Sequence, residues 1–187
     1  MPDFDFDATL RWARFAPRKT LSRQSGDELP FLDNASAGQA LLLDTCVYID
    51  GLQGRTPDAV ADLLDLRIVN HSAVAVQELM HSIGALDPRH PGSKVAIDRI
   101  GGLIRAMPPH RVFAPDTDML AKGAMLSGIL CRLQGYAADD RYRALHDCVL
   151  FVQAQKLGLT VLTANVGDFD LLLQMLPAGR AIFYRPL

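Results

Sequence analysis

The sequence lacks any long uninterrupted apolar run, although 49% of its 187 residues are hydrophobic. A helix that crosses a bilayer needs about 20 consecutive apolar residues, and no stretch of this chain approaches that length. Residues 3–7 read Asp-Phe-Asp-Phe-Asp, and the apolar segment of a secretory signal is missing there. We therefore expect no contact with a membrane and no ordinary secretion.

Cysteine is scarce, and charge of either sign is modest. Cys46, Cys131 and Cys148 form no Cys-x-x-Cys pair and no Cys/His run with zinc-finger spacing. We interpret them as reduced, mostly buried thiols of a cytoplasmic protein. The formal net charge is −2, so affinity for nucleic acid would have to come from a local basic patch rather than from the field of the whole molecule.

What the sequence does contain, from Leu41 onward, is an alternation of short apolar runs with helical stretches. The length fits one domain with a full core. Strands separated by helices require right-handed crossovers, which predicts an α/β fold: a three-layer α/β/α sandwich with a central parallel sheet. The expected strands are 41–46, 67–70, 111–114, 160–163 and 181–184, and the expected helices include 58–66, 93–106, 117–133, 145–157 and 169–176.

Several residues mark where these elements begin and end. Pro57 fits the first turn of a helix, and Ser72 fits the N-cap of the helix that carries Glu78. Gly158 fits the C-cap of the apolar helix 145–157. Residues 135–140 are expected to form a loop.

Residues 1–38 are the least regular part of the chain, and we interpret them as an N-terminal extension before a domain at 39–187. Two interpretations of the extension are open. It is either an arm packed across the domain surface or a functional segment that contacts RNA or clasps a second copy.

Four acidic residues stand where strands end or near where helices begin: Asp44, Glu78, Asp147 and Asp168. In a parallel sheet such positions meet at the carboxyl edge. Carboxylates forced together repel and raise each other's pKa unless a cation neutralises them. Oxygen ligands favour Mg²⁺ or Mn²⁺, which activates water for phosphodiester hydrolysis.

Each acid also has a structural explanation. Asp44 could cap the following turn, Asp147 could be a first-turn acid stabilised by the helix dipole, and Asp168 could be an N-cap. Glu78 lies on an inward helix face, where an unpaired carboxylate is costly. Short polar side chains nearby either orient ligands and phosphate or satisfy loop backbone; these are Thr45, Thr163 and Asn165.

Taken together and in this order, four motifs resemble the PIN-domain nucleases over residues 40–187. They are the strand 41–45 (LLLDT), the acid in 76–79 (VQEL), the helix-start Asp147, and 162–165 (LTAN) ahead of Asp168. The resemblance implies a parallel α/β/α sandwich and metal-dependent endoribonuclease activity, with all four acids as ligands of Mg²⁺ or Mn²⁺. Small bacterial members of this family, the VapC-like proteins, are commonly toxins of type II toxin-antitoxin pairs. For this chain that implies an RNA substrate, a cognate antitoxin partner and a homodimer.

Other readings of the acids fit less well. A haloacid-dehalogenase-like phosphatase needs a second Asp two residues after Asp44, where this chain has Cys46. A receiver domain needs a Lys after the last strand, and none follows residues 181–183. A di-iron bundle needs two Glu-x-x-His motifs, and only Glu78 and His81 form one. A PIN-fold RNA-processing protein that is not a toxin and a catalytically silent binding module remain as alternatives.

A slightly acidic protein needs cationic side chains near its acidic pocket to hold RNA. Arg141 and Arg143 lie just before Asp147 in the sequence and are the expected RNA contacts. Arg11 and Arg14 could reach the site only if the extension folds back. Among the histidines, His146 beside Asp147 is the one closest to the expected site.

Overall fold

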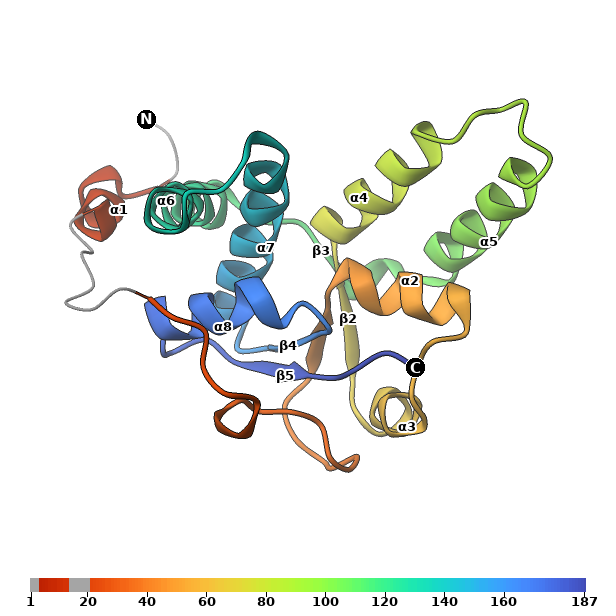
Figure 1. Ribbon diagram of the computed structural model, residues 1–187, viewed down its shortest axis with the longest axis horizontal. Coiled ribbons are helices and arrows are strands. Elements are labelled where there is room, and N and C mark those ends of the chain that lie inside the picture. Colours follow the sequence, from red (N-terminus) through yellow and green to blue (C-terminus); the bar gives the residue numbers. More distant parts are fainter. Residues whose placement is uncertain (1–3, 14–20) are drawn as a thin grey trace.

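A five-stranded parallel sheet in the order β3-β2-β1-β4-β5 forms the centre of the computed structural model (Figure 1). The structure describes residues 4–13 and 21–187, except the side chains of residues 13 and 138–140. Each pair of neighbouring strands in this sheet is parallel. This confirms the predicted fold class. The strands are β1 (Leu41–Leu43), β2 (Val69–Ser72), β3 (Val112–Phe113), β4 (Thr160–Thr163) and β5 (Ala181–Phe183).

Helices cover both faces of the sheet, and alternate strand residues divide between two cores. Leu42 and Val161 pack into one core and Leu43 and Leu162 into the other. The first core lies against α6 (Thr117–Gln134), α7 (Ala138–Leu157) and α8 (Val166–Met175), and the second lies against α2 (Thr45–Gln53), α3 (Asp58–Leu66), α4 (Ala73–Gly84) and α5 (Ser93–Ala106). Two layers of helices around one sheet make the expected three-layer sandwich. In the part of the chain that the structure describes, no helix is both long and apolar enough to cross a membrane.

The sequence signals at the helix ends act largely as expected. Ser72 caps α4 by accepting a hydrogen bond from the amide of Val74 at 3.1 Å. Gly158 ends α7 at a φ of +70°, a left-handed conformation that glycine adopts without a Cβ clash. Pro57 is the N-cap residue of α3 and not its first helical residue.

Two elements differ from the prediction in ways that affect the site. The first strand ends at Leu43, because helix α2 begins directly at Thr45. Helix α7 begins at Ala138, so most of the expected loop at 135–140 is helical. Gly135, with a φ of +66°, reverses the chain after α6 within a few residues, which leaves room for a much longer α7.

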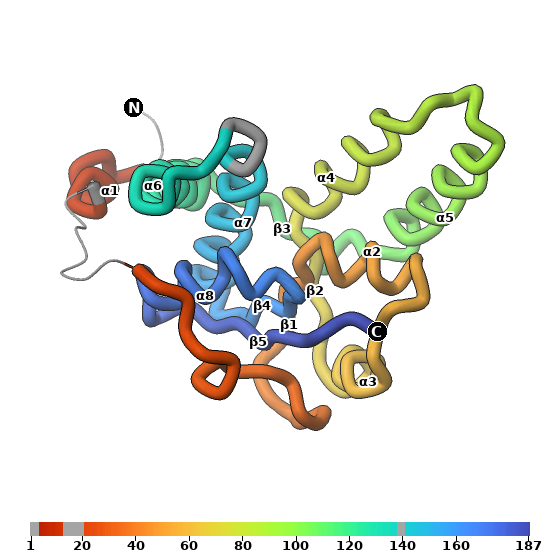
Figure 2. Tube along the Cα trace, viewed as in Figure 1, coloured from red at the N-terminus to blue at the C-terminus, as the bar shows by residue number. Residues whose placement is uncertain are grey.

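The extension contains more structure than its composition indicated. Helix α1 (Phe6–Ala13) lies beside α6, and the segment from residue 21 runs back along β5 (Figure 2). Phe31 bridges Phe183 in parallel, with Leu32 N donating to Phe183 O at 2.7 Å and Phe183 N donating to Pro30 O at 2.9 Å. The packed arm is thus the arrangement seen for residues 21–32. The domain division at residue 38 stays a prediction.

Candidate active site at the carboxyl ends of the strands

Asp44 leaves β1 and occupies the N-cap position of α2, but its side chain does not cap that helix. Its Oδ2 instead accepts hydrogen bonds from Thr163 Oγ1 at 2.5 Å and from Cys46 Sγ at 3.1 Å. Burial raises its pKa above the ordinary aspartate value, and the charge of Glu78 adds to the rise against these hydrogen bonds. Asp44 is thus the N-cap residue of α2, but its carboxylate is held by Thr163 and Cys46 and not by a side-chain cap.

Glu78 comes from the middle of α4 and is not left unpaired. Thr45 Oγ1 donates to one carboxylate oxygen, and His146 Nδ1 lies 2.7 Å from the other. Thr45 belongs to the first turn of α2 and His146 to α7, so this one carboxylate ties three helices together. His146, which the sequence marked only by its position beside Asp147, is a direct partner of the site.

Asp147 lies in the middle of α7 and not at a helix start, which corrects the sequence interpretation. A first-turn acid stabilised by the helix dipole is excluded by this position. Its Oδ2 accepts from Asn165 Nδ2 at 3.0 Å. Its pKa is raised well above the ordinary value, first by burial and then by the charges of Asp44, Asp168 and Glu78.

Asp168 lies in the first turn of α8, where Asn165, and not Asp168, is the N-cap. Asn165 Oδ1 accepts from the Asp168 amide at 3.3 Å, while its Nδ2 donates to Asp168 Oδ2 at 3.2 Å as well as to Asp147. The hydroxyl of Tyr136 donates to Asp168 Oδ1. The side-chain amide of Asn165 therefore caps α8 and also hydrogen-bonds two of the four acids.

A cavity of about 510 Å³ opens over these groups. Asp168 is linked to it through Asn165 but is not one of the lining residues. The lining consists of Asp44, Thr45, Cys46, Ile49, Glu78, His81, Ser82, Tyr142, Arg143, His146, Asp147 and Asn165. The structure thus brings three of the predicted acids into one pocket and connects the fourth to it by a hydrogen bond.

The donor set suits a hard divalent cation, although the side chains are turned toward protein partners. Among the described residues, no group of three or more His, Cys, Asp or Glu side chains is arranged to hold a metal ion. Each carboxylate is instead held by a neighbouring hydroxyl, thiol, amide or imidazole donor. Because Asp44, Glu78 and Asp168 all raise the pKa of Asp147, a cation among them would relieve a repulsion that the protein alone leaves in place.

The two arginines expected to contact RNA are placed differently relative to the pocket, and their role in RNA binding stays a prediction. Arg143 lines the pocket, whereas Arg141 uses its Nε to hold the carbonyl oxygen of Tyr136 at 3.0 Å. Arg23 is an addition that sequence reasoning missed: a methyl group placed on Gly167 would lie 3.0 Å from its Nη2, beside Asp168. Its charge also acts to lower the pKa of Tyr136, which burial and Asp168 raise. Arg11 lies on α1, and Arg14 lies outside the described residues.

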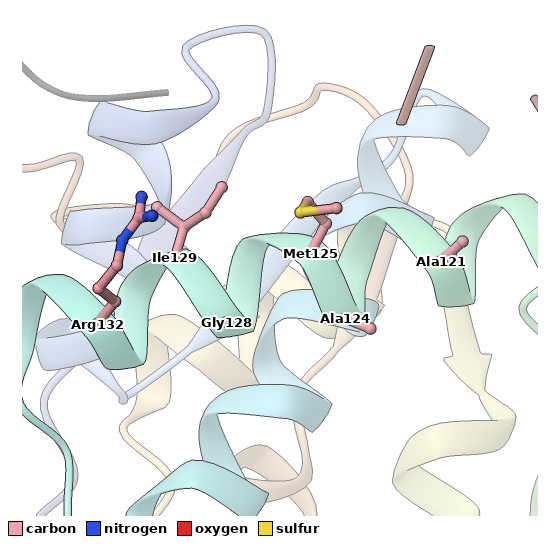
Figure 3. Close-up of a pocket in the computed structure, with 6 residues that line it drawn as sticks. All are labelled: Ala121, Ala124, Met125, Gly128, Ile129 and Arg132. Atoms are coloured by element: carbon pink, nitrogen blue, oxygen red, sulfur yellow. The ribbon is translucent and has the colours of Figure 1, made fainter. Parts of the chain in front are cut away.

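Two other hollows share little with this chemistry. An apolar groove of about 570 Å³ between α2, α4 and α5 meets the acidic pocket at Ile49 and Ser82. A hollow of about 390 Å³ on α6 is lined by small and apolar side chains with one cation, as Figure 3 shows: Ala121, Ala124, Met125, Gly128, Ile129 and Arg132. It contains no carboxylate, hydroxyl or imidazole, so it lacks the groups for hydrolysis.

No family model matches the chain, and no curated protein matches it significantly. Solved structures do resemble it. FitAcB from Neisseria gonorrhoeae matches with a TM-score of 0.53 and 23% identity, covering 76% of this chain and 96% of that chain. VapBC2 from Rickettsia felis, solved with a promoter DNA fragment, matches with a TM-score of 0.51 and 13% identity, covering 78% of this chain and 98% of that chain. DNA-bound VapBC from Salmonella typhimurium matches with a TM-score of 0.51 and 18% identity, covering 79% of this chain and 98% of that chain. At these identities the likeness establishes a shared fold.

Proposed function

We propose that this protein is a metal-dependent endoribonuclease whose Asp44, Glu78, Asp147 and Asp168 hold Mg²⁺ or Mn²⁺. The observation that carries the proposal is that acids distant in the sequence meet at one pocket. Asp44, Glu78 and Asp147 come from separate elements and line one pocket, and burial, followed by the charges of Asp44, Asp168 and Glu78, raises the pKa of Asp147 well above its ordinary value. Close carboxylates destabilise the folded protein by their repulsion, and a bound cation removes that repulsion.

The side chains around the acids have positioning roles in this proposal. Thr45 and His146 fix the orientation of Glu78, Thr163 fixes Asp44, and Asn165 fixes Asp147 and Asp168 together. When bound, the metal would activate a water molecule and stabilise charge that develops on the phosphate. Arg143 at the pocket and Arg23 beside Asp168 supply cations for the RNA backbone.

The test is cleavage of a labelled RNA with Mg²⁺ or Mn²⁺ and in excess chelator. We expect cleavage only with metal, and products with a 5′-phosphate and a 3′-hydroxyl, because water and not the ribose 2′-hydroxyl is the nucleophile. Asp147→Asn should abolish it, and Asp98→Asn, at an exposed acid of α5, is the matched control. Cleavage in chelator, a 2′,3′-cyclic phosphate product or full activity of Asp147→Asn would contradict the proposal.

We further propose that the protein acts as a cytoplasmic toxin with an antitoxin partner, and as a homodimer. The support is the fold shared with chains of the FitAB and VapBC complexes, together with the acidic site. Induction of the wild-type gene should arrest growth, and induction of Asp147→Asn should not. RNA cleavage without growth arrest would favour an RNA-processing enzyme. Metal-independent RNA binding without cleavage would favour a binding module.

A further inference from the structure

One large aromatic side chain stands exposed at the acidic pocket. Tyr142 lines the pocket together with Asp44, Glu78 and Asp147, yet it is 50% exposed. A tyrosine contributes a large apolar face, and most such area is buried in folded proteins. The position of Tyr142 on α7, one turn before His146, sets it on the same face of that helix.

The ring is exposed but held. Its centroid lies 4.3 Å from that of His146 in an edge-on arrangement and 6.5 Å from that of His81. Gln77 Nε2 also donates to its hydroxyl at 3.4 Å. A side chain fixed by its neighbours loses little further freedom when a ligand covers it, which favours binding.

The same cluster is directly connected to the acids. His146, against which Tyr142 packs, is hydrogen-bonded to Glu78 at 2.7 Å, and His81 and His146 both line the pocket. A nucleotide whose phosphate reaches the carboxylates would therefore bring an adjoining base to this ring. Aromatic rings bind bases that are free of their own stack, because the two flat faces must meet.

We propose that Tyr142, backed by His81 and His146, is a stacking platform for an unpaired base next to the scissile phosphate. This inference rests on the proposed nuclease function and assigns a base-binding residue to its site. Stacking accepts every base because every base has a flat face, so the platform selects strandedness and not sequence. Base-paired RNA, whose bases remain stacked on each other, cannot use it.

The test is binding of a short single-stranded RNA that contains 2-aminopurine, whose fluorescence falls when it stacks, to the Asp147→Asn protein in Mg²⁺. In that background, Tyr142→Phe keeps the ring and should keep both quenching and affinity. Tyr142→Leu removes the flat face and should lose the quenching and weaken binding on the order of tenfold. Leu120→Ala, which alters a 47% exposed side chain on α6, is the matched control and should change neither.

Quenching that is unchanged in Tyr142→Leu, or a blunt RNA duplex that binds as tightly as the single strand, would overturn the platform. Should Tyr142→Leu not fold, the duplex comparison with the parent protein decides. The two proposals fail in different ways. If the wild-type protein cleaves no RNA but shows the Tyr142-dependent quenching, only the nuclease proposal is contradicted. If it cleaves RNA but Tyr142→Leu binds RNA as the parent does, only the platform proposal is contradicted.

Discussion

The two helix pairs that flank the pocket are built differently. Helices α6 and α7 are in such close contact at Gly123 that a Cβ there would lie 2.6 Å from Val149 Cγ2 and 2.8 Å from its Cα. Helices α4 and α5 instead project beyond the sheet (Figure 1), and a groove runs between them and α2. Their exposed side chains include Met80, Val95 and Ile97. Asp147 stands on the tightly packed pair and Glu78 on the pair that borders the groove.

The largest expected difference between the two pairs is in core truncation. Phe151 on α7 is fully buried and packs edge-on against Phe169, with ring centroids 6.0 Å apart. Phe151→Ala should lower the free energy of unfolding by about 3 to 5 kcal/mol. Met80→Ala on α4, at a 53% exposed position, should change it by less than about 0.5 kcal/mol. Denaturant melts measure both, and equal losses would remove the contrast.

Glycine substitution gives a matched pair with effects of opposite sign. Gly123→Ala on α6 pushes a methyl group into the backbone of α7 and should destabilise the protein by about 1 to 3 kcal/mol. Gly102→Ala on α5 meets nothing within 4 Å and should stabilise it by about 0.5 to 1 kcal/mol, because alanine favours the helix. Thermal unfolding of the two variants checks the signs. A neutral Gly123→Ala would mean that the close contact is easily relieved.

The acid on the tight pair gives a pH-dependent effect. Burial and the charges of Asp44, Asp168 and Glu78 raise the folded-state pKa of Asp147 above its ordinary value of 3.8. Its ionisation therefore opposes folding at neutral pH, and this penalty disappears as the pH falls below 3.8. Asp147→Asn should therefore raise the melting temperature of the metal-free protein at pH 7, with a gain that shrinks toward pH 4. Asp98→Asn, at an exposed acid of α5, is the control variant. A gain that grows at low pH would contradict the assigned direction.

The smallest expected effects concern the cations around the site. Arg143→Ala and Arg23→Ala should each weaken RNA binding and reduce the slope of log affinity against log salt by about one. Arg141→Ala should reduce it less, because the Arg141 guanidinium is bound to the Tyr136 carbonyl. The measurement is RNA binding to the metal-loaded Asp147→Asn protein across a salt series. A larger loss of RNA affinity in Arg141→Ala than in Arg23→Ala would support the expectation from the sequence that Arg141 contacts RNA.

The sequence was sufficient for the parts of the fold that local patterns determine. The apolar run ending at Asp44 predicts a buried strand that delivers an acid, and the structure has that arrangement. It was insufficient where a long-range contact decides. The mixed polar stretch before Leu145 reads as a loop, yet packing of α7 on α6 makes it helical, which moves Asp147 to mid-helix and aligns Tyr142 with His146. Arg23 was missed because no local pattern shows that residues 21–24 return to α8.

The parallel bridge between Phe31 and Phe183 bears on solubility. Strand β5 is an edge of the sheet, and an uncovered edge offers free amides and carbonyls to any other extended chain. Here residues 30–32 occupy part of that edge. The Phe31 ring lies tilted against Phe183, with centroids 5.7 Å apart, and the Arg185 guanidinium lies 4.2 Å from the Phe31 ring centroid. A protein shortened at residue 38 would therefore expose a ready template for intermolecular pairing. Its loss of activity would then report aggregation and not a missing RNA contact.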